Sequence, residues 1–283
     1  MGVERFFSSV KNDFNIIKNT NKPYIKLEGK HLFIDFNSIV HVLSAHMIST
    51  INNCIKKQKE NCPFKFDTSD NFENNLLKEI NNYLIDLIGG NVNSKNLETI
   101  YMAIDGVPTM AKISEQKKRR YMGSMISFLT EKKESEFSWS KNNISPGTSF
   151  MKLLQDNLKS NNLKERIKKI CPKLKKLIIS DTSSPGEGEM KIINYIKKYL
   201  NKSNDDIIVY SPDSDMIILL MMLENNLTIL RYDQQKSILD DNFNGKIYNI
   251  LNVNNFSDVL INHIKSRINH INIHKRNIIN DII

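Results

Sequence analysis

The stretch Ser184-Pro185-Gly186-Glu187-Gly188-Glu189-Met190-Lys191 joins a predicted buried strand to a predicted helix. The strand is the apolar run Leu177-Ile178-Ile179, and the helix carries apolar residues at the spacing of an inner face, at Met190, Ile192, Ile193 and Ile196. Two carboxylates therefore lie in a glycine-flanked turn at the carboxyl end of a strand. Such a turn is either a solvated start of a helix, where acids are favourable, or a site where a cation neutralises neighbouring carboxylates.

Acids follow three further apolar runs. The run His31–Ile34 leads into Asp35, the run Leu97–Ile104 into Asp105, and the run Ile207–Tyr210 into Ser211-Pro212-Asp213-Ser214-Asp215. Helical patterns lie between these runs, so we expect an α/β fold with a mostly parallel central sheet flanked by helices. Because ligands bind beyond the carboxyl ends of such strands, we expect six acids to meet there: Asp35, Asp105, Glu187, Glu189, Asp213 and Asp215.

These six acids suggest a metal site. Together they carry six negative charges, which two divalent cations would largely offset. Carboxylate oxygens suit Mg²⁺ or Mn²⁺, and no histidine or cysteine accompanies them as zinc would require. Two such ions fit in-line cleavage of a phosphodiester, since one activates the attacking water and the other stabilises the leaving oxygen.

A polar segment follows Asp105. Its residues Lys112, Gln116, Arg119 and Arg120 are spaced to share one face of a helix. A charged face of this kind is commonly just solvated. Here the predicted helix begins at the end of an acid-bearing strand, so the face is also a candidate site for a terminal phosphate beside the metal site.

The bulk composition sets broader limits. Lys and Arg number 40 against 31 Asp and Glu, which gives a net charge of +9 and a pI near 9.2. This balance favours a polyanionic partner such as nucleic acid, although it is also compatible with solubility alone. The three cysteines form no motif, which indicates a reducing compartment. No apolar leader precedes the first helix, and the run Met216–Leu223 is too short to span a bilayer. We therefore expect an intracellular, soluble protein without a membrane partner.

Other segments complete the predicted organisation. We expect an amphipathic helix over residues 4–18, and Ser38 as the cap of a helix after the first strand. Residues 51–70 and 131–147 are expected to be loops or insertions, the second an exposed connection that includes Trp139. Helices are expected over 71–88, closed by Gly89-Gly90, over 148–168, and over 255–283. Short strands are expected at 227–230 and 246–248.

Several motifs together resemble the N-terminal catalytic region of Xrn-type 5′→3′ exoribonucleases, which are similar to PIN and flap nucleases. The motifs are collinear from residue 1 to about 231 and are specific in combination. They are Met1-Gly2-Val3 with Phe6-Phe7, Asp35-Phe36-Asn37-Ser38-Ile39-Val40-His41, Asp105-Gly106-Val107-Pro108, Lys112 with Gln116 and Arg119-Arg120, Ser145-Pro146-Gly147-Thr148, Pro185-Gly186-Glu187-Gly188-Glu189-Met190-Lys191 and Asp213-Ser214-Asp215.

The resemblance implies roles for these residues. The six acids would be metal ligands, and Lys112, Gln116, Arg119 and Arg120 would bind a 5′-monophosphate. His41 would stack on the first base, although a histidine hydrogen-bonded within the core is the competing interpretation. The implied activity is metal-dependent, stepwise hydrolysis of single-stranded RNA from its 5′ end.

The resemblance also implies a departure. The family continues with a Gly-Asn-Asp-Phe segment that supplies one more acid, and then with an aromatic partner for the stacked base, and neither occurs in this sequence. We therefore expect residues 1–231 to form the nuclease domain and 232–283 to extend it, truncated before the rest of the family's conserved region. Two alternatives remain open: a 5′ nuclease that acts on DNA flaps, and an inactive RNA-binding remnant.

Overall fold

The computed structural model describes residues 17–19, 26–57, 62–129, 137–201, 203–232 and 248–267, together with Phe7, Val10 and Phe14. Of the predicted helix over residues 4–18, Phe7, Val10 and Phe14 are helical and Val10 is buried, but Lys18 belongs to a strand, so the predicted helix extends too far. The predicted helical residues 268–283 lie outside the described residues. None of the helices in the described ranges is long and apolar enough to cross a membrane.

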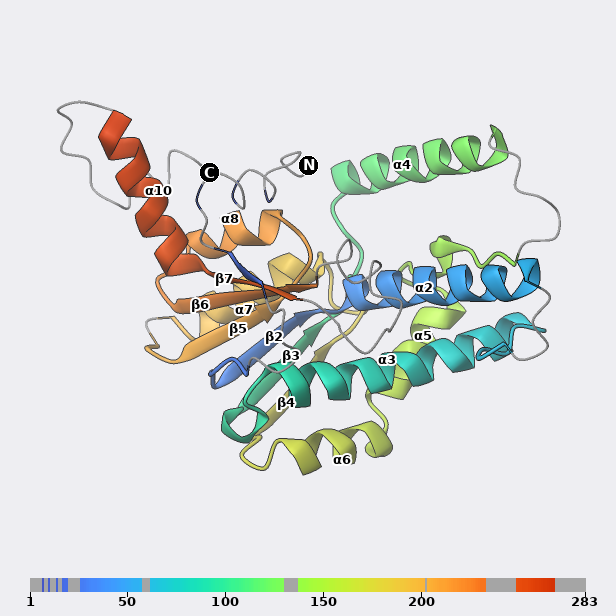
Figure 1. The fold of residues 1–283 in the computed structure, drawn as a ribbon, viewed down its shortest axis with the longest axis horizontal. Coiled ribbons are helices and arrows are strands. Elements are labelled where there is room, and N and C mark those ends of the chain that lie inside the picture. Colours follow the sequence, from blue (N-terminus) through green and yellow to red (C-terminus); the bar gives the residue numbers. More distant parts are fainter. Residues whose placement is uncertain are drawn as a thin grey trace.

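A mixed sheet forms the centre of the molecule (Figure 1). Its strands run in the order β1-β7-β6-β5-β2-β3-β4. Pairing is parallel from β6 to β4, and β7 runs antiparallel to β6 and to β1. The predicted mostly parallel α/β fold is thereby confirmed. The strands are β1 (Lys18–Asn19), β2 (His31–Asp35), β3 (Thr99–Ala103), β4 (Lys176–Ser180), β5 (Asp206–Tyr210), β6 (Asn226–Tyr232) and β7 (Tyr248–Asn252).

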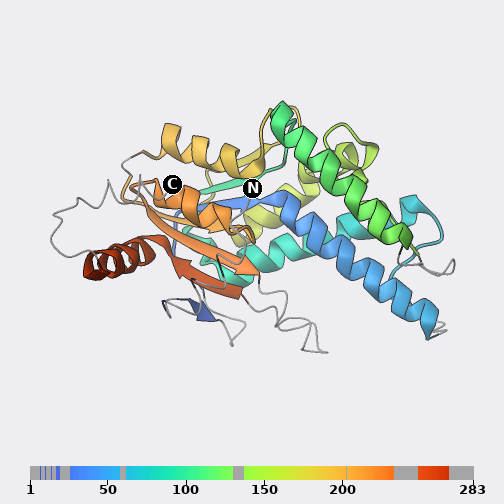
Figure 2. The same cartoon turned by 90° about the horizontal axis from the view of Figure 1, so that it is seen from above.

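Helices cover both faces of the sheet (Figures 1 and 2). Alternate residues of β2 show why: Leu32 and Ile34 belong to one buried cluster and Phe33 to the other. The first cluster contains α2 (Phe36–Lys56), α3 (Ser69–Asn91), α5 (Ser149–Leu158) and α6 (Asn161–Ile170). The second contains α7 (Gly188–Tyr199), α8 (Asp215–Met221) and α10 (Val253–Arg267). The chain also forms α4 (Met110–Leu129) and two short 3₁₀ helices, η1 (Ser94–Asn96) and η2 (Lys141–Asn143).

Strand β2 lies at the point where the direction of chain progression reverses. It pairs with β3 on one side and with β5 on the other, and His31 is in register with both Thr99 and Ile207. In open parallel sheets, ligands bind in the crevice outside the carboxyl ends of the strands at this position. The fold therefore places Asp35, the last residue of β2, at the expected binding edge.

The structure corrects several predicted boundaries. Helix α2 begins at Phe36, directly after β2, and the Ser38 hydroxyl donates to the Asp35 carbonyl at 2.6 Å, so Ser38 is not the cap. The same helix runs to Lys56, so the predicted loop at 51–70 begins too early. Helix α3 continues to Asn91 and includes both glycines that were expected to end it. The apolar faces of α2 and α3 pack in the core beside the sheet. This packing, and not the capping signal of single residues, sets where these helices begin and end.

Two predicted environments are also wrong. Met190 is 40% exposed, and it lies off the inner face that Ile192, Ile193 and Ile196 form. Trp139 is buried instead of exposed, because its ring packs against Phe72 and Phe150 and its indole nitrogen donates to Glu73 at 3.0 Å. A buried indole N–H needs such a partner.

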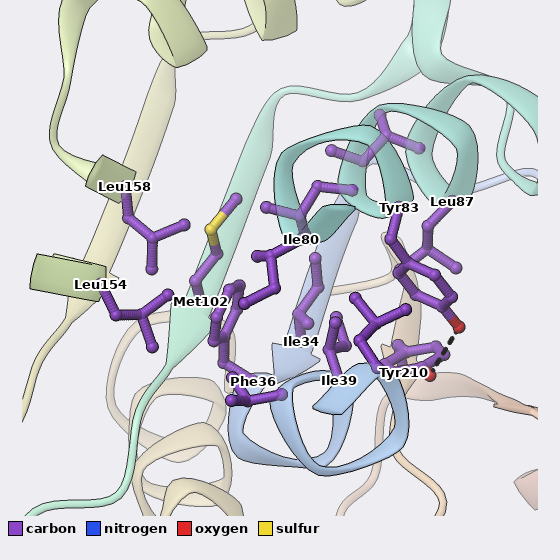
Figure 3. Close-up of a cluster of buried hydrophobic side chains, with 14 of the residues drawn as sticks. Ile34, Phe36, Ile39, Ile80, Tyr83, Leu87, Met102, Leu154, Leu158 and Tyr210 are labelled. Carbon is purple, nitrogen blue, oxygen red and sulfur yellow. Dashed lines mark hydrogen bonds between the residues drawn. The ribbon is translucent and has the colours of Figure 1, made fainter. Parts of the chain in front are cut away.

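Three tyrosine hydroxyls meet in the core, and Figure 3 shows the contact between Tyr83 and Tyr210. The Tyr83 oxygen lies 2.9 Å from that of Tyr210, and the Tyr248 hydroxyl donates to Tyr83 at 3.3 Å. Tyr83 and Tyr210 come from α3 and β5, so the polar contact joins a helix to the sheet. Burial raises the pKa of all three hydroxyls above the usual value, which keeps them neutral donors and acceptors.

The central position of Tyr83 generates a stability prediction. The substitution Tyr83→Phe would remove the hydroxyl shared by Tyr210 and Tyr248, so we expect the free energy of unfolding to fall by about 1–3 kcal/mol. Urea denaturation followed by circular dichroism measures this. The control is Tyr199→Phe, which changes an exposed tyrosine and should leave the midpoint in place. Equal midpoints for both variants would contradict the prediction.

Candidate active site

The loops that follow β3 and β4 are joined by backbone hydrogen bonds. The amide of Gly106 donates to the Gly186 carbonyl at 2.9 Å, and the amide of Gly186 donates to the Val107 carbonyl at 3.0 Å. Gly186 has a φ of 98°, a conformation that favours glycine. A Cβ on Gly106 would lie 1.9 Å from the Ser184 carbonyl oxygen, so only glycine allows this close approach. The two acid-bearing loops are therefore held together by their backbones.

Asp105 is fixed by hydrogen bonds to both carboxylate oxygens. The amide of Gly188, at the start of α7, donates to Oδ1 at 2.7 Å, and the Asn37 side chain donates to Oδ2 at 3.0 Å. Asn37 also accepts from the Asp105 amide at 3.3 Å. Burial raises the pKa of Asp105, while these donors together with Lys112 and Lys191 oppose the shift.

Asp35 lies close to Asp105. A Cβ on Gly188 would lie 3.2 Å from an Asp35 oxygen and 3.3 Å from an Asp105 oxygen, so glycine at this position leaves room for both carboxylates. Burial, followed by the charge of Asp105, raises the pKa of Asp35 to about 8, although the Ser211 hydroxyl donates to it at 3.0 Å. Burial disfavours the charged form of a carboxyl group, and a neighbouring negative charge disfavours it further.

The remaining acids extend this cluster. Burial raises the pKa of Glu189 to about 7, and the charges of Asp213, Glu187 and Asp215 add to the shift. Asp213 is positioned by the turn after β5, because its amide donates to the Ser211 hydroxyl at 3.1 Å. The amide of Asp215 in turn donates to Asp213 at 3.1 Å. Of the six predicted acids, all except Asp215 line one large cavity.

The predicted phosphate-binding face lines the same cavity. It is formed by Lys112, Gln116, Arg119 and Arg120 of α4, and the cavity has a volume of about 1420 Å³. The Lys112 ammonium group lies 3.3 Å from a Glu187 oxygen and so joins this face to the acids. The Arg120 guanidinium donates to the Ser145 hydroxyl at 2.8 Å. The structure thus brings the acids and the cations to one place.

His41 also lies in the wall of this cavity. The residue as a whole is exposed and is not part of the core, although its imidazole is partly desolvated by the cavity. Loss of water within the cavity lowers its pKa, and the charges of Lys141 and Arg120 lower it further. The imidazole is therefore neutral near pH 7, and its ring can contact a base without adding charge.

The donor set fits Mg²⁺ or Mn²⁺ in its chemistry, because all six candidate ligands are carboxylates. Within the described residues, no three His, Cys, Asp or Glu side chains are already arranged to hold one ion. Burial, and then the neighbouring carboxylates, raise the pKa of Asp35 and Glu189. A divalent cation between them would oppose both shifts.

Three supporting residues were not assigned a role from the sequence. Asn37 and Ser211 hold Asp105 and Asp35, respectively. Lys191 is buried, and its ammonium group donates to the carbonyls of Ile104 at 2.7 Å and Asp181 at 2.8 Å, which fixes the strand ends that carry the acids. All three lie in sequence stretches quoted above. The signal that could have found them is a polar residue at a position where the pattern predicts the core.

The mostly parallel sheet therefore carries clustered acids at its carboxyl edge and a cationic helix beside them. The model of the family described as "XRN 5′-3′ exonuclease N-terminus" matches residues 1–233. The chain therefore belongs to this family.

Relatives support the same family. A protein of Acanthamoeba polyphaga mimivirus, whose name describes a 5′-3′ exonuclease, is 35% identical over 149 residues, which are 50% of this chain and 23% of that protein. The 5′-3′ exoribonuclease 1 of Saccharomyces cerevisiae is 28% identical over 271 residues, which cover 85% of this chain and 16% of the relative. Human 5′-3′ exoribonuclease 1 is 27% identical over 82% of this chain and 13% of its own length. The chain thus spans less than a quarter of these relatives.

The contact between the two loops generates a prediction. The substitution Gly106→Ala would force the backbone at Ser184 to move, and we expect the free energy of unfolding to fall by about 1–3 kcal/mol. Gly90→Ala is the matched control, because a Cβ there meets nothing within 4 Å and Gly90 lies inside helix α3. That variant should be as stable as the wild type or more stable, by up to about 1 kcal/mol. Urea denaturation compares the two, and a Gly106→Ala variant of unchanged stability would contradict the close approach.

Proposed function

We propose that this chain is a metal-dependent 5′→3′ exoribonuclease that hydrolyses 5′-monophosphorylated single-stranded RNA stepwise. The observation that carries the proposal is the cavity that both the acids and the cationic face of α4 line. The contact between Lys112 and Glu187 marks where these two parts meet. A terminal phosphate on α4 would place the first phosphodiester at the acids, which explains stepwise removal from the 5′ end. Family membership supports this proposal independently.

The chain's own residues would act mainly by positioning. Arg119 and Arg120 offer planar donors for phosphate oxygens, and Gln116 adds a neutral donor. The neutral His41 ring would stack on the first base. Asn37, Ser211 and the Gly188 amide hold the two central carboxylates in fixed orientations, so little reorganisation is needed during the reaction.

The carboxylates would hold the cofactor. Asp35, Asp105, Glu187, Glu189, Asp213 and Asp215 are the proposed ligands of Mg²⁺ or Mn²⁺. Bound there, two such ions would lower the pKa of the attacking water and stabilise the leaving oxygen. Carboxylates bind metal in their deprotonated form. Cleavage should require divalent metal and cease with chelator.

The substitution Asp213→Asn tests the proposed metal site. It removes one negative charge and one ligand but keeps the shape, so we expect cleavage to fall by about 10²-fold or more while RNA binding is retained. Single-turnover cleavage of 5′-phosphorylated RNA with Mg²⁺ measures the rate. Asp156→Asn is the control, because Asp156 is an exposed acid on α5 outside the cavity. An Asp213→Asn variant that cleaves at the wild-type rate would refute the two-metal account.

A substrate panel separates the remaining alternatives. We expect 5′-phosphorylated single-stranded RNA to be degraded faster than single-stranded DNA, a DNA flap or RNA with a 5′ hydroxyl. Gel analysis of end-labelled products measures each rate, with and without Mg²⁺ or Mn²⁺. Preference for the flap would favour a DNA nuclease. Salt-dependent RNA binding without any product would favour an RNA-binding remnant.

A further inference from the structure

Besides the acids and α4, another segment of the chain lines the cavity and forms a second wall. Residues 138–142 and Ile144 line it, and this segment contains the short helix η2. Its only described cation is Lys141, which is exposed and lies in the cavity lining together with Arg119 and Arg120 of α4. Lys141 comes from a part of the chain distinct from the phosphate-binding face on α4. The cavity is therefore cationic on both walls.

The two walls are close at this point. The Arg120 guanidinium donates to the hydroxyl of Ser145, which follows η2, at 2.8 Å. Charges from both walls act on His41. Desolvation is the main cause that lowers its pKa, and the charges of Lys141 and Arg120 lower it further. The Ser140 hydroxyl accepts from the Asn142 amide at 3.2 Å and so fixes the turn that carries Lys141. Lys141 therefore lies near His41 on a defined turn.

The charges on these walls have few internal partners. Lys112 is paired with Glu187, but the ion pairs among the described residues include neither Arg119 nor Lys141. A terminal phosphate carries a charge of about −1.5 to −2 at neutral pH and offers three acceptor oxygens. Donors on one helix face reach only one side of such a tetrahedral group. A cation on the η2 segment, such as Lys141, could contact the oxygens that α4 leaves exposed.

A second contact to a bound anion would also stabilise helix α4. Its described residues from Lys117 to Gly123 are all exposed, so this part of the helix packs against little else (Figure 1). Figures 1 and 2 both show α4 alongside α2 on the side of the molecule where α2 extends beyond the sheet. An anion bound by α4 alone would sit on a weakly supported helix. An anion held by both walls would join α4 to η2 and restrict its motion.

We propose that Lys141 is a specificity-determining residue that binds the 5′-terminal phosphate of RNA from the η2 segment of the cavity wall. This inference rests on the proposed function, because it assigns a further residue to the same 5′ end. It predicts that discrimination between a 5′ phosphate and a 5′ hydroxyl depends on Lys141. It also predicts that binding of a 5′-phosphorylated RNA protects α4 from exchange.

Equilibrium binding tests this inference without requiring cleavage. Two oligoribonucleotides of one sequence, with a 5′ phosphate or a 5′ hydroxyl, are titrated into the full chain in the presence of chelator. We expect Lys141→Gln to reduce the ratio of the two affinities by about three- to fivefold, the range of one partly exposed charge contact. Lys141→Arg keeps the charge and should retain most of the ratio.

The control separates a specific contact from general attraction. Lys152→Gln removes one exposed positive charge on α5 outside the cavity, so it should weaken both RNAs equally and leave the ratio unchanged. An unchanged ratio in Lys141→Gln would overturn the role of Lys141. A wild type that does not distinguish the two RNAs would instead refute the proposed recognition of the 5′ phosphate.

Hydrogen exchange provides a second readout. With the wild type, 5′-phosphorylated RNA should slow exchange of amides in α4, and this protection should weaken in Lys141→Gln although the RNA still binds. Full protection in that variant at saturating RNA would show that the bound RNA protects α4 without the Lys141 contact.

Discussion

Repulsion between buried like charges is the constraint on which this structure depends. Asp35 and Asp105 approach each other beside Gly188, and burial raises the pKa of both. Such an arrangement persists only because backbone amides, Asn37 and the Ser211 hydroxyl donate to the carboxylates and the surrounding core holds the strand ends. The unfavourable electrostatics are confined to one edge of an otherwise apolar sheet, which is where a cationic ligand would relieve them.

The cationic helix complements this edge. Lys112 reaches Glu187, while Arg119 and Arg120 face the same cavity farther along α4. The site therefore has a gradient from strongly acidic strand ends to a basic wall. The proposed substrate end would suit such a gradient, since its first phosphodiester would lie at the acids and its terminal charge among the cations.

The sequence was sufficient to predict the parallel strands and the edge at which the acids lie, because each of these strands is an apolar run and the acids lie at or beyond their carboxyl ends. It did not predict β1, which has no apolar run and begins within a predicted helix. It could not predict where α2 begins, since Asp35 precedes the helix without a side-chain cap and Ser38 offered a stronger local signal. The glycines in α3 and the burial of Trp139 depend on partners far apart in the chain, such as Glu73 and Phe150. The supporting roles of Asn37, Ser211 and Lys191 likewise arise only from tertiary contacts.

The pairing of β2 with β5 has a consequence for how the protein is made. Asp35 and its partner Ser211 are separated by 176 residues, and everything from α2 to α7 intervenes. On a ribosome, Asp35 and Asp105 emerge well before the strand that brings Asp213. The nascent chain therefore cannot complete its acidic centre until β5 has left the exit tunnel, so the centre is assembled late in synthesis.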